Sequence, residues 1–368
     1  MKTLLLGCAL LALSAAATAA PDDKKKVDPV DAAMAKVSKQ WEKEVISASR
    51  YTFECFGKGT DEGCQGRMDA FQRAFNAPDI DEGGRHYVLK DALHTLGVWG
   101  KNKREHGDKQ GSIQILNGAY GMMMQHFEGG KHFHTIIENL PLQTEAYLTL
   151  DALGQADDAA TVLNNARSAI DSFYGAREEF KGNKHQEDLL KTALVGSEHL
   201  ETDIAKALEK QLDDLGDGGD QAKRDALNKR LEEAWRRAGD WIERATEAGV
   251  SGSMDLSPRI RMADARIGLG RTLMQNARRK EAEAAFREAA LYTCSMVGED
   301  FEQRMEAGKP FKHPEEGFAN ERCDKAAHGV NWADGTFDRI MKESFDRQWQ
   351  LQMEIWDSVA KNGVVSPD

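Results

Sequence analysis

Apolar residues recur at alternating spacings of three and four along most of the chain, which is the pattern of one buried helix face. The pattern begins after Asp28, a residue type that caps helix N-termini, and Pro29, which suits a first helical position. Alternating strand patterns are scarce, so the sequence predicts an all-α fold. Helices are expected over 29–55, 64–76, 85–98, 112–127, 130–139, 143–154, 156–173, 185–212, 221–248, 258–277, 279–297 and 335–361.

Glycine, proline and polar runs divide this helical pattern into segments. The clearest break is the glycine-rich stretch 212–221, between two highly charged helices. We expect a signal peptide over 1–19, an N-terminal helical segment over 20–110 and a region of helical hairpins over 111–216. A final part over 221–368 is expected to hold a further hairpin and an aromatic helix.

The first residues have the pattern of a secretory signal peptide. One lysine precedes an apolar run that is too short to span a membrane, and Ala17-Thr18-Ala19 supplies the small residues of a cleavage site. We therefore expect an exported protein, periplasmic or secreted, with no integral membrane segment. Cys8 follows a stretch similar to a bacterial lipobox, so a lipid anchor at Cys8 is the alternative to ordinary cleavage.

The stretch Gly268-Leu269-Gly270 raises the question of a phosphate-binding loop. A dinucleotide fingerprint needs a preceding strand and a third small residue three places further on. The preceding segment is helix-like, and Leu273 occupies the third position. The two glycines are therefore predicted to be positions of close helix packing.

The spacing around these glycines resembles that of the tetratricopeptide-repeat family. From Gly270, a leucine, an alanine, an aromatic residue and a second alanine follow at the distances of that repeat: Leu273, Ala282, Phe286 and Ala289. A second stretch fits less fully, with Ala146, Tyr147, Leu150, Gly154, Ala159, Leu163 and Ala166. The two matches cover roughly 140–173 and 263–296.

The resemblance implies stacked antiparallel hairpins in an irregular superhelix, with a helical bundle as the structural alternative. It also implies a concave groove that holds a protein or peptide partner. On the matching positions the groove residues would be Thr144, Leu148, Asp151, Asp264, Ile267, Arg271 and Gln275.

Four cysteines follow the predicted signal peptide, and an even number in an exported chain suggests disulfides. Four cysteines allow three pairings. The local pairs are favoured, Cys55 with Cys64 across a glycine-rich turn and Cys294 with Cys323 across a longer loop. Buried free thiols are the alternative.

The net charge and the absence of known motifs reduce the number of possible functions. The formal charge is −12, which disfavours nucleic acid as a partner because phosphates would be repelled. The signatures of common hydrolases, nucleotide enzymes and haem proteins are missing, so we expect a non-catalytic scaffold without a cofactor. The competing hypothesis is an exported zinc- or copper-binding protein that uses His126, His132 and His134, which lie close to several methionines.

Aromatic residues and methionines follow one another about four apart near the C-terminus. They are Trp332, Phe337, Met341, Phe345, Trp349, Met353 and Trp356. Such a stripe is expected to be buried, either as a helix that caps the end of the array or as a surface for a partner.

Overall fold

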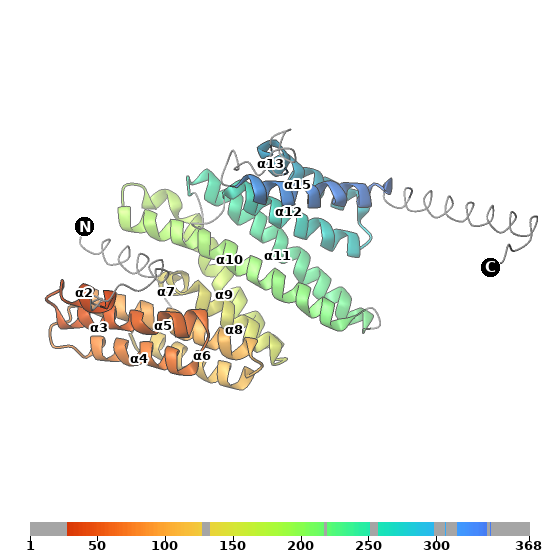
Figure 1. The fold of residues 1–368 in the computed structure, drawn as a ribbon. Helices are drawn as coiled ribbons and strands as arrows, with labels where there is room; N and C mark the ends of the chain where they lie inside the picture. The colour runs from red at the N-terminus through yellow and green to blue at the C-terminus, as the bar shows by residue number, and fades with distance from the viewer. Residues whose placement is uncertain are drawn as a thin grey trace, which may run out of the picture. The chain divides into compact units, whose positions relative to one another are not determined.

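The protein is all-α in the computed structural model, which describes residues 28–126, 133–216, 219–250, 257–297, 306, 315–336 and 339. These residues form helices and the turns between them, and none of them lies in a strand. The helices pack mostly against their neighbours in sequence (Figure 1). The predicted fold class is therefore confirmed, whereas a repeat superhelix does not follow from this packing alone.

The chain divides into two compact units, Met1–Gly196 and Ser197–Asp368. In the first unit the helices are α2 (Pro29–Met34), α3 (Gln40–Ala48), α4 (Asp61–Phe75), α5 (Glu82–Glu105), α6 (Lys109–His126), α7 (Phe133–Glu138), α8 (Leu140–Ala152) and α9 (Ala156–Gly175). Short turns of other helix types lie at Ser49–Tyr51, Phe53–Gly57 and Arg177–Phe180. The long helix α10 (Lys184–Leu215) begins in this unit and ends in the second.

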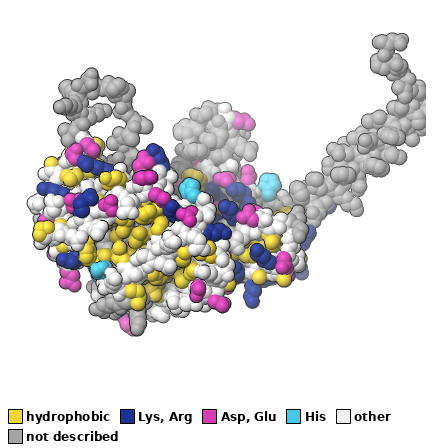
Figure 2. All heavy atoms as spheres, turned by 90° about the horizontal axis from the view of Figure 1, so that it is seen from below, with side chains coloured by type: hydrophobic (Ala, Val, Ile, Leu, Met, Phe, Trp, Pro, Cys, Tyr) yellow, Lys and Arg dark blue, Asp and Glu magenta, His cyan; other side chains and the backbone are white. Residues whose placement is uncertain are grey.

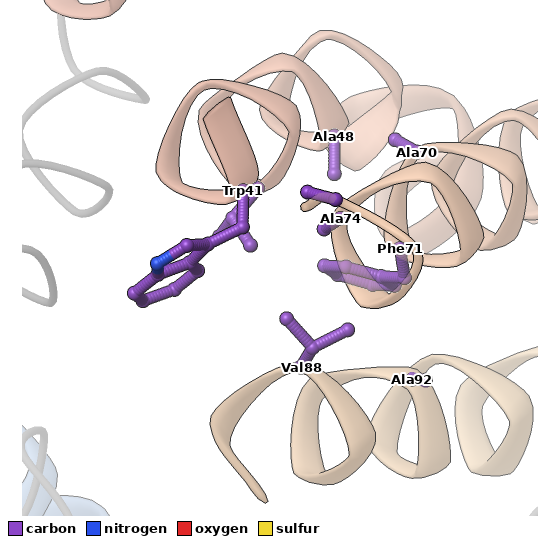
Figure 3. Close-up of a cluster of buried hydrophobic side chains, with 9 residues drawn as sticks. Trp41, Ala48, Ala70, Phe71, Ala74, Val88 and Ala92 are labelled. Atoms are coloured by element: carbon purple, nitrogen blue, oxygen red, sulfur yellow. The ribbon is translucent and has the colours of Figure 1, made fainter. Parts of the chain in front are cut away.

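One core of the first unit lies between α3, α4 and α5. Trp41 of α3 and Phe71 of α4 are its largest side chains, and Val88 of α5 points towards them (Figure 3). Val45 and five alanines fill the remaining positions, and these small side chains bring the three helices close together. A second cluster joins α5, α6 and α8 through Leu93, Leu96, Leu116, Ala119, Met123, Leu142 and Ala146.

The predicted helix 29–55 is wrong in its length, because the chain breaks after α2. The start was read correctly: the Asp28 carboxylate accepts a hydrogen bond from the Val30 amide at 2.8 Å. The chain then leaves the helix at 35–39, and α3 starts anew with its first amides bonded to Asp79, Gln40 N to Oδ2 at 2.6 Å and Trp41 N to Oδ1 at 3.3 Å. A cap supplied from 39 residues further along the chain has no local sequence signature.

The second unit contains the end of α10, then α11 (Gln221–Glu247), α12 (Pro258–Gln275), α13 (Arg279–Thr293), a short 3₁₀ turn at Cys294–Met296, and α15 (Glu316–Ala333). Gly268 and Gly270 both lie inside α12, so neither belongs to a phosphate-binding loop. A Cβ atom on Gly268 would lie 2.3 Å from the ring of Trp235 in α11, and one on Gly270 would lie 2.7 Å from the ring of Phe286 in α13. The prediction that these glycines are close-packing positions is confirmed.

Helix α15 (Glu316–Ala333) occupies a region in which no helix was predicted. Its apolar residues are few and it contains Gly317 and Gly329, so its periodicity is weak. Apart from Glu316 at its start, its buried residues are small, and this side of the helix packs against α12 and α13: Ala319, Ala326, Gly329 and Ala333. The predicted aromatic helix 335–361 lies almost entirely outside the described residues, and so does the predicted signal peptide.

Both predicted disulfides are present. Cys55 and Cys64 are joined with their Cα atoms 4.5 Å apart, and Cys294 and Cys323 with theirs 4.9 Å apart. The first bridge ties the turn at Phe53–Gly57 to α4 and is fully buried. The second ties the end of α13 to α15 and is half-buried.

Candidate functional site

A cavity of about 600 Å³ lies between α12, α13 and α15 in the second unit. Its size is within the range of ligand-binding sites. Helix α15 contributes most of the lining. The lining residues are Arg271, Phe286, Glu321, Asp324, Lys325, His328, Gly329 and Trp332.

The apolar part of the cavity depends on the packing around Phe286. This ring is almost fully buried and lies against two positions without side chains, Gly270 and Gly329. A Cβ atom on Gly329 would lie 2.3 Å from Phe286 Cδ1. Trp332, one turn beyond Gly329, remains 40% exposed and gives the cavity a second aromatic wall.

The rim carries charges of both signs. Lys325 Nζ donates a hydrogen bond to Glu321 Oε1 at 2.6 Å, and this bond lowers the pKa of the Glu321 carboxyl below its ordinary value. His328 Nδ1 lies 2.8 Å from the backbone oxygen of Asp324. Arg271 forms no ion pair with any residue that the structure describes, although its charge acts on the carboxyl of Glu209, whose pKa burial raises and Arg271 lowers. The cavity therefore presents aromatic surface next to a guanidinium that is available to a ligand.

Two links hold α15 in place beside the cavity. The Cys294–Cys323 bridge fixes one side of the helix to the end of α13. Arg322 donates two hydrogen bonds to the carboxylate of Asp264 in α12, from Nε to Oδ1 at 3.0 Å and from Nη2 to Oδ2 at 3.2 Å. The cavity wall is thus attached to both helices of the α12–α13 hairpin.

Of the expected groove residues in the second unit, only Arg271 lines the cavity. Ile267 is buried within the helix packing, and Gln275 is exposed at the end of α12. Asp264 is half-buried, and its carboxylate forms an ion pair with Arg322 of α15.

The expected groove residues of the first unit lie on α8. Thr144 is buried and its hydroxyl donates to the backbone oxygen of Leu140 at 2.9 Å. Leu148 is also buried, and Asp151 is half-buried near the end of the helix.

Helix α8 also carries a buried polar network. Glu145 accepts two hydrogen bonds from Arg104 of α5, from Nε at 2.5 Å and from Nη2 at 3.0 Å. Thr149 donates to the same carboxylate at 3.0 Å and lies 2.9 Å from Ser112 of α6. Burial raises the pKa of Glu145, although the bonds from Arg104 and Thr149 act in the opposite direction. The network joins α5, α6 and α8.

The predicted metal ligands lie only in part within the described residues. His126 is exposed at the end of α6, with its ring centroid 5.2 Å from that of Phe75. His132 lies outside the described residues. His134 is in α7, and its side chain is not described. Within the described ranges no group of three or more metal-ligating side chains comes together.

Sequence reasoning missed most of the cavity lining. Glu321, Asp324, Lys325 and His328 lie between 297 and 335, where no helix was predicted. The available signal was the recurrence of Phe318, Lys325 and Trp332 at multiples of seven residues, which is a helical period.

The face of the molecule shown in Figure 2 has hydrophobic side chains interspersed with acidic and basic ones, and neither charge forms an uninterrupted field there. In the described part of the chain no helix has the length and apolar character needed to cross a bilayer. Comparison of the chain with protein-family models and with curated proteins finds no match.

Proposed function

We propose that this chain is an exported, non-catalytic protein that binds a protein or peptide partner in the cavity between α12, α13 and α15. The cavity itself is the observation that carries the proposal: about 600 Å³, with Phe286 and Trp332 as aromatic walls and Arg271 on its rim. Aromatic and arginine side chains are the residue types that dominate binding energy at protein interfaces.

Export is supported by two independent features. The N-terminal sequence has the signal-peptide pattern, and two disulfides are characteristic of oxidising compartments. N-terminal sequencing of the mature protein is expected to begin at Ala20. A mature chain that begins at Cys8 would instead indicate lipid anchoring.

The binding function is tested by chemical crosslinking in the native compartment, followed by purification of the full chain. Wild-type protein is expected to retain one partner reproducibly, and Trp332→Ala is expected to lose most of it. Leu291→Ala is the matched control, since Leu291 is a 75% exposed apolar residue of the same unit that does not line the cavity. If wild type and Trp332→Ala retain the same proteins in equal amounts, the cavity is not the binding site.

The metal-binding alternative has its own test. Purified mature protein is incubated with zinc or copper(I), desalted and analysed for bound metal. Stoichiometric metal that is lost on replacing His126, His132 and His134 by alanine would favour that function over the proposed one.

A further inference from the structure

Helix α15 carries a row of exposed aromatic and charged side chains along one face, which is called the stripe below. Phe318, Glu321, Lys325, His328 and Trp332 are all exposed and follow one another at spacings of three, four, three and four residues. This spacing places them along one face of the helix. The two ends of the stripe are aromatic, with Phe318 48% and Trp332 40% exposed, and its middle is charged.

The backbone of α15 and its neighbours excludes one common mode of peptide binding. Recognition by strand addition needs a sheet edge with unpaired amides and carbonyls. The cavity walls are helices, whose backbone groups are already bonded within each helix. A partner must therefore be recognised through side chains that fit between those of the stripe.

Resting on the proposed function, we propose that the partner docks as an amphipathic α-helix of about four turns, laid along the exposed stripe of α15. Phe318 and Trp332 are 14 residues apart, which corresponds to about 21 Å along a helix axis at 1.5 Å per residue. A partner helix presents two large apolar side chains at this separation. One enters the cavity beside Trp332, and the other covers Phe318.

The charges define a third feature of the partner. Glu321 pairs with both Lys325 and Arg322, whereas neither Arg271 nor Asp324 forms an ion pair with a residue that the structure describes. Guanidinium groups bind carboxylates through two parallel hydrogen bonds. The partner helix therefore carries an acidic residue near its cavity anchor, facing Arg271, and a basic residue facing Asp324.

The contact is mapped by placing a photo-crosslinking phenylalanine derivative at position 318 or 332 of the full chain, in the native compartment. Both positions are expected to crosslink to one segment of a single partner, at sites about 14 residues apart. Crosslinks to residues 337–361 of the same chain, to a second copy of the chain, or to separate segments of a partner would overturn the inference.

A third crosslinker at Phe53, which is 67% exposed in the first unit, separates the two proposals. A partner captured at position 332 but not at 318 would leave binding in the cavity standing and overturn the docking along α15, whereas capture at position 53 alone would overturn both. Capture at none of the three positions would overturn both.

The crosslinked segment, made as a synthetic peptide, then serves as the probe for affinity measurements. Trp332→Ala is expected to weaken binding about tenfold or more, as for central aromatic residues at interfaces, and Trp332→Phe to restore most of it. Arg271→Glu is expected to weaken binding of the peptide. A peptide whose acidic residue is changed to lysine is expected to restore the affinity for this variant. Unchanged affinity in Trp332→Ala, or no recovery in the charge exchange, would contradict the assigned contacts, with Leu291→Ala as the control for exposed apolar residues.

Discussion

The ring of Phe286 in α13 lies so close to Gly329 in α15 that a Cβ atom on Gly329 would lie 2.3 Å from Phe286 Cδ1. The same ring touches α12 at Gly270, so a single aromatic side chain sets the separations of the three helices that form the cavity. Any side chain at either glycine would have to displace the ring or one of the helices.

This relationship predicts that Gly329→Ala and Gly270→Leu destabilise the protein by about 1–3 kcal/mol each, the usual cost of overpacking. Denaturant unfolding of the purified variants measures the loss. Gly118→Ala is the matched control, because Gly118 is also inside a helix and a Cβ atom there would meet nothing within 4 Å. Because alanine has a higher helix propensity than glycine, the control substitution is expected to be neutral or slightly stabilising. Equal effects at positions 329 and 118 would contradict the close packing.

The two disulfides are expected to differ in their sensitivity to reductant. Cys55 and Cys64 are both 0% exposed, whereas Cys294 and Cys323 are half-buried. Mild reductant applied to the native protein should therefore reduce Cys294–Cys323 first, because exchange requires access to a sulfur. Alkylation and peptide mapping over time give the order, and reduction of Cys55–Cys64 first would contradict it.

Removal of each disulfide is expected to lower stability by about 3 kcal/mol on the loop-closure estimate. The variants are Cys55→Ala with Cys64→Ala, and Cys294→Ala with Cys323→Ala. The second pair should also lower partner binding, since that bridge holds the cavity wall. If binding falls equally in both double variants, general destabilisation would explain the loss instead.

Breaking the buried pair of Glu145 and Arg104 from one side is expected to be costly. Glu145→Ala leaves the Arg104 guanidinium without its two bonds to the carboxylate and should cost about 3–5 kcal/mol. Replacing both residues, with Arg104→Met and Glu145→Leu, should cost less than Glu145→Ala alone. Unfolding measurements on single and double variants test this order, and additive losses would show that the two residues are not energetically coupled.

The pair of His86 and Glu138 predicts a pH dependence of stability. The distance from His86 Nε2 to Glu138 Oε2 is 3.4 Å, and the hydrogen bond to this carboxylate raises the pKa of His86. A histidine with a raised folded-state pKa contributes stability below its unfolded pKa of about 6.5, and loses it as the pH rises through the folded value. We expect a decrease of less than about 1 kcal/mol above pH 6.5, because the His86 side chain is half exposed.

Thermal unfolding at a series of pH values measures this decrease, and His86→Gln should remove it. His199→Gln is the control, since His199 is exposed and forms no ion pair with the residues that the structure describes. A slope that persists in His86→Gln would assign the pH dependence to other groups.

The sequence by itself determined the helical class, most helix positions, the role of Gly268 and Gly270 and both disulfide pairs. These features depend on short-range information: the period of apolar residues, the size of a side chain and the length of a loop between cysteines. The break after α2 was decided by the tertiary structure, since Asp79 caps α3 from a distant position. The same is true of α15, whose apolar pattern is weak and whose Gly329 packs closely on Phe286 of α13. The cavity beside it could not be predicted, because it exists only where α15 packs against the α12–α13 hairpin.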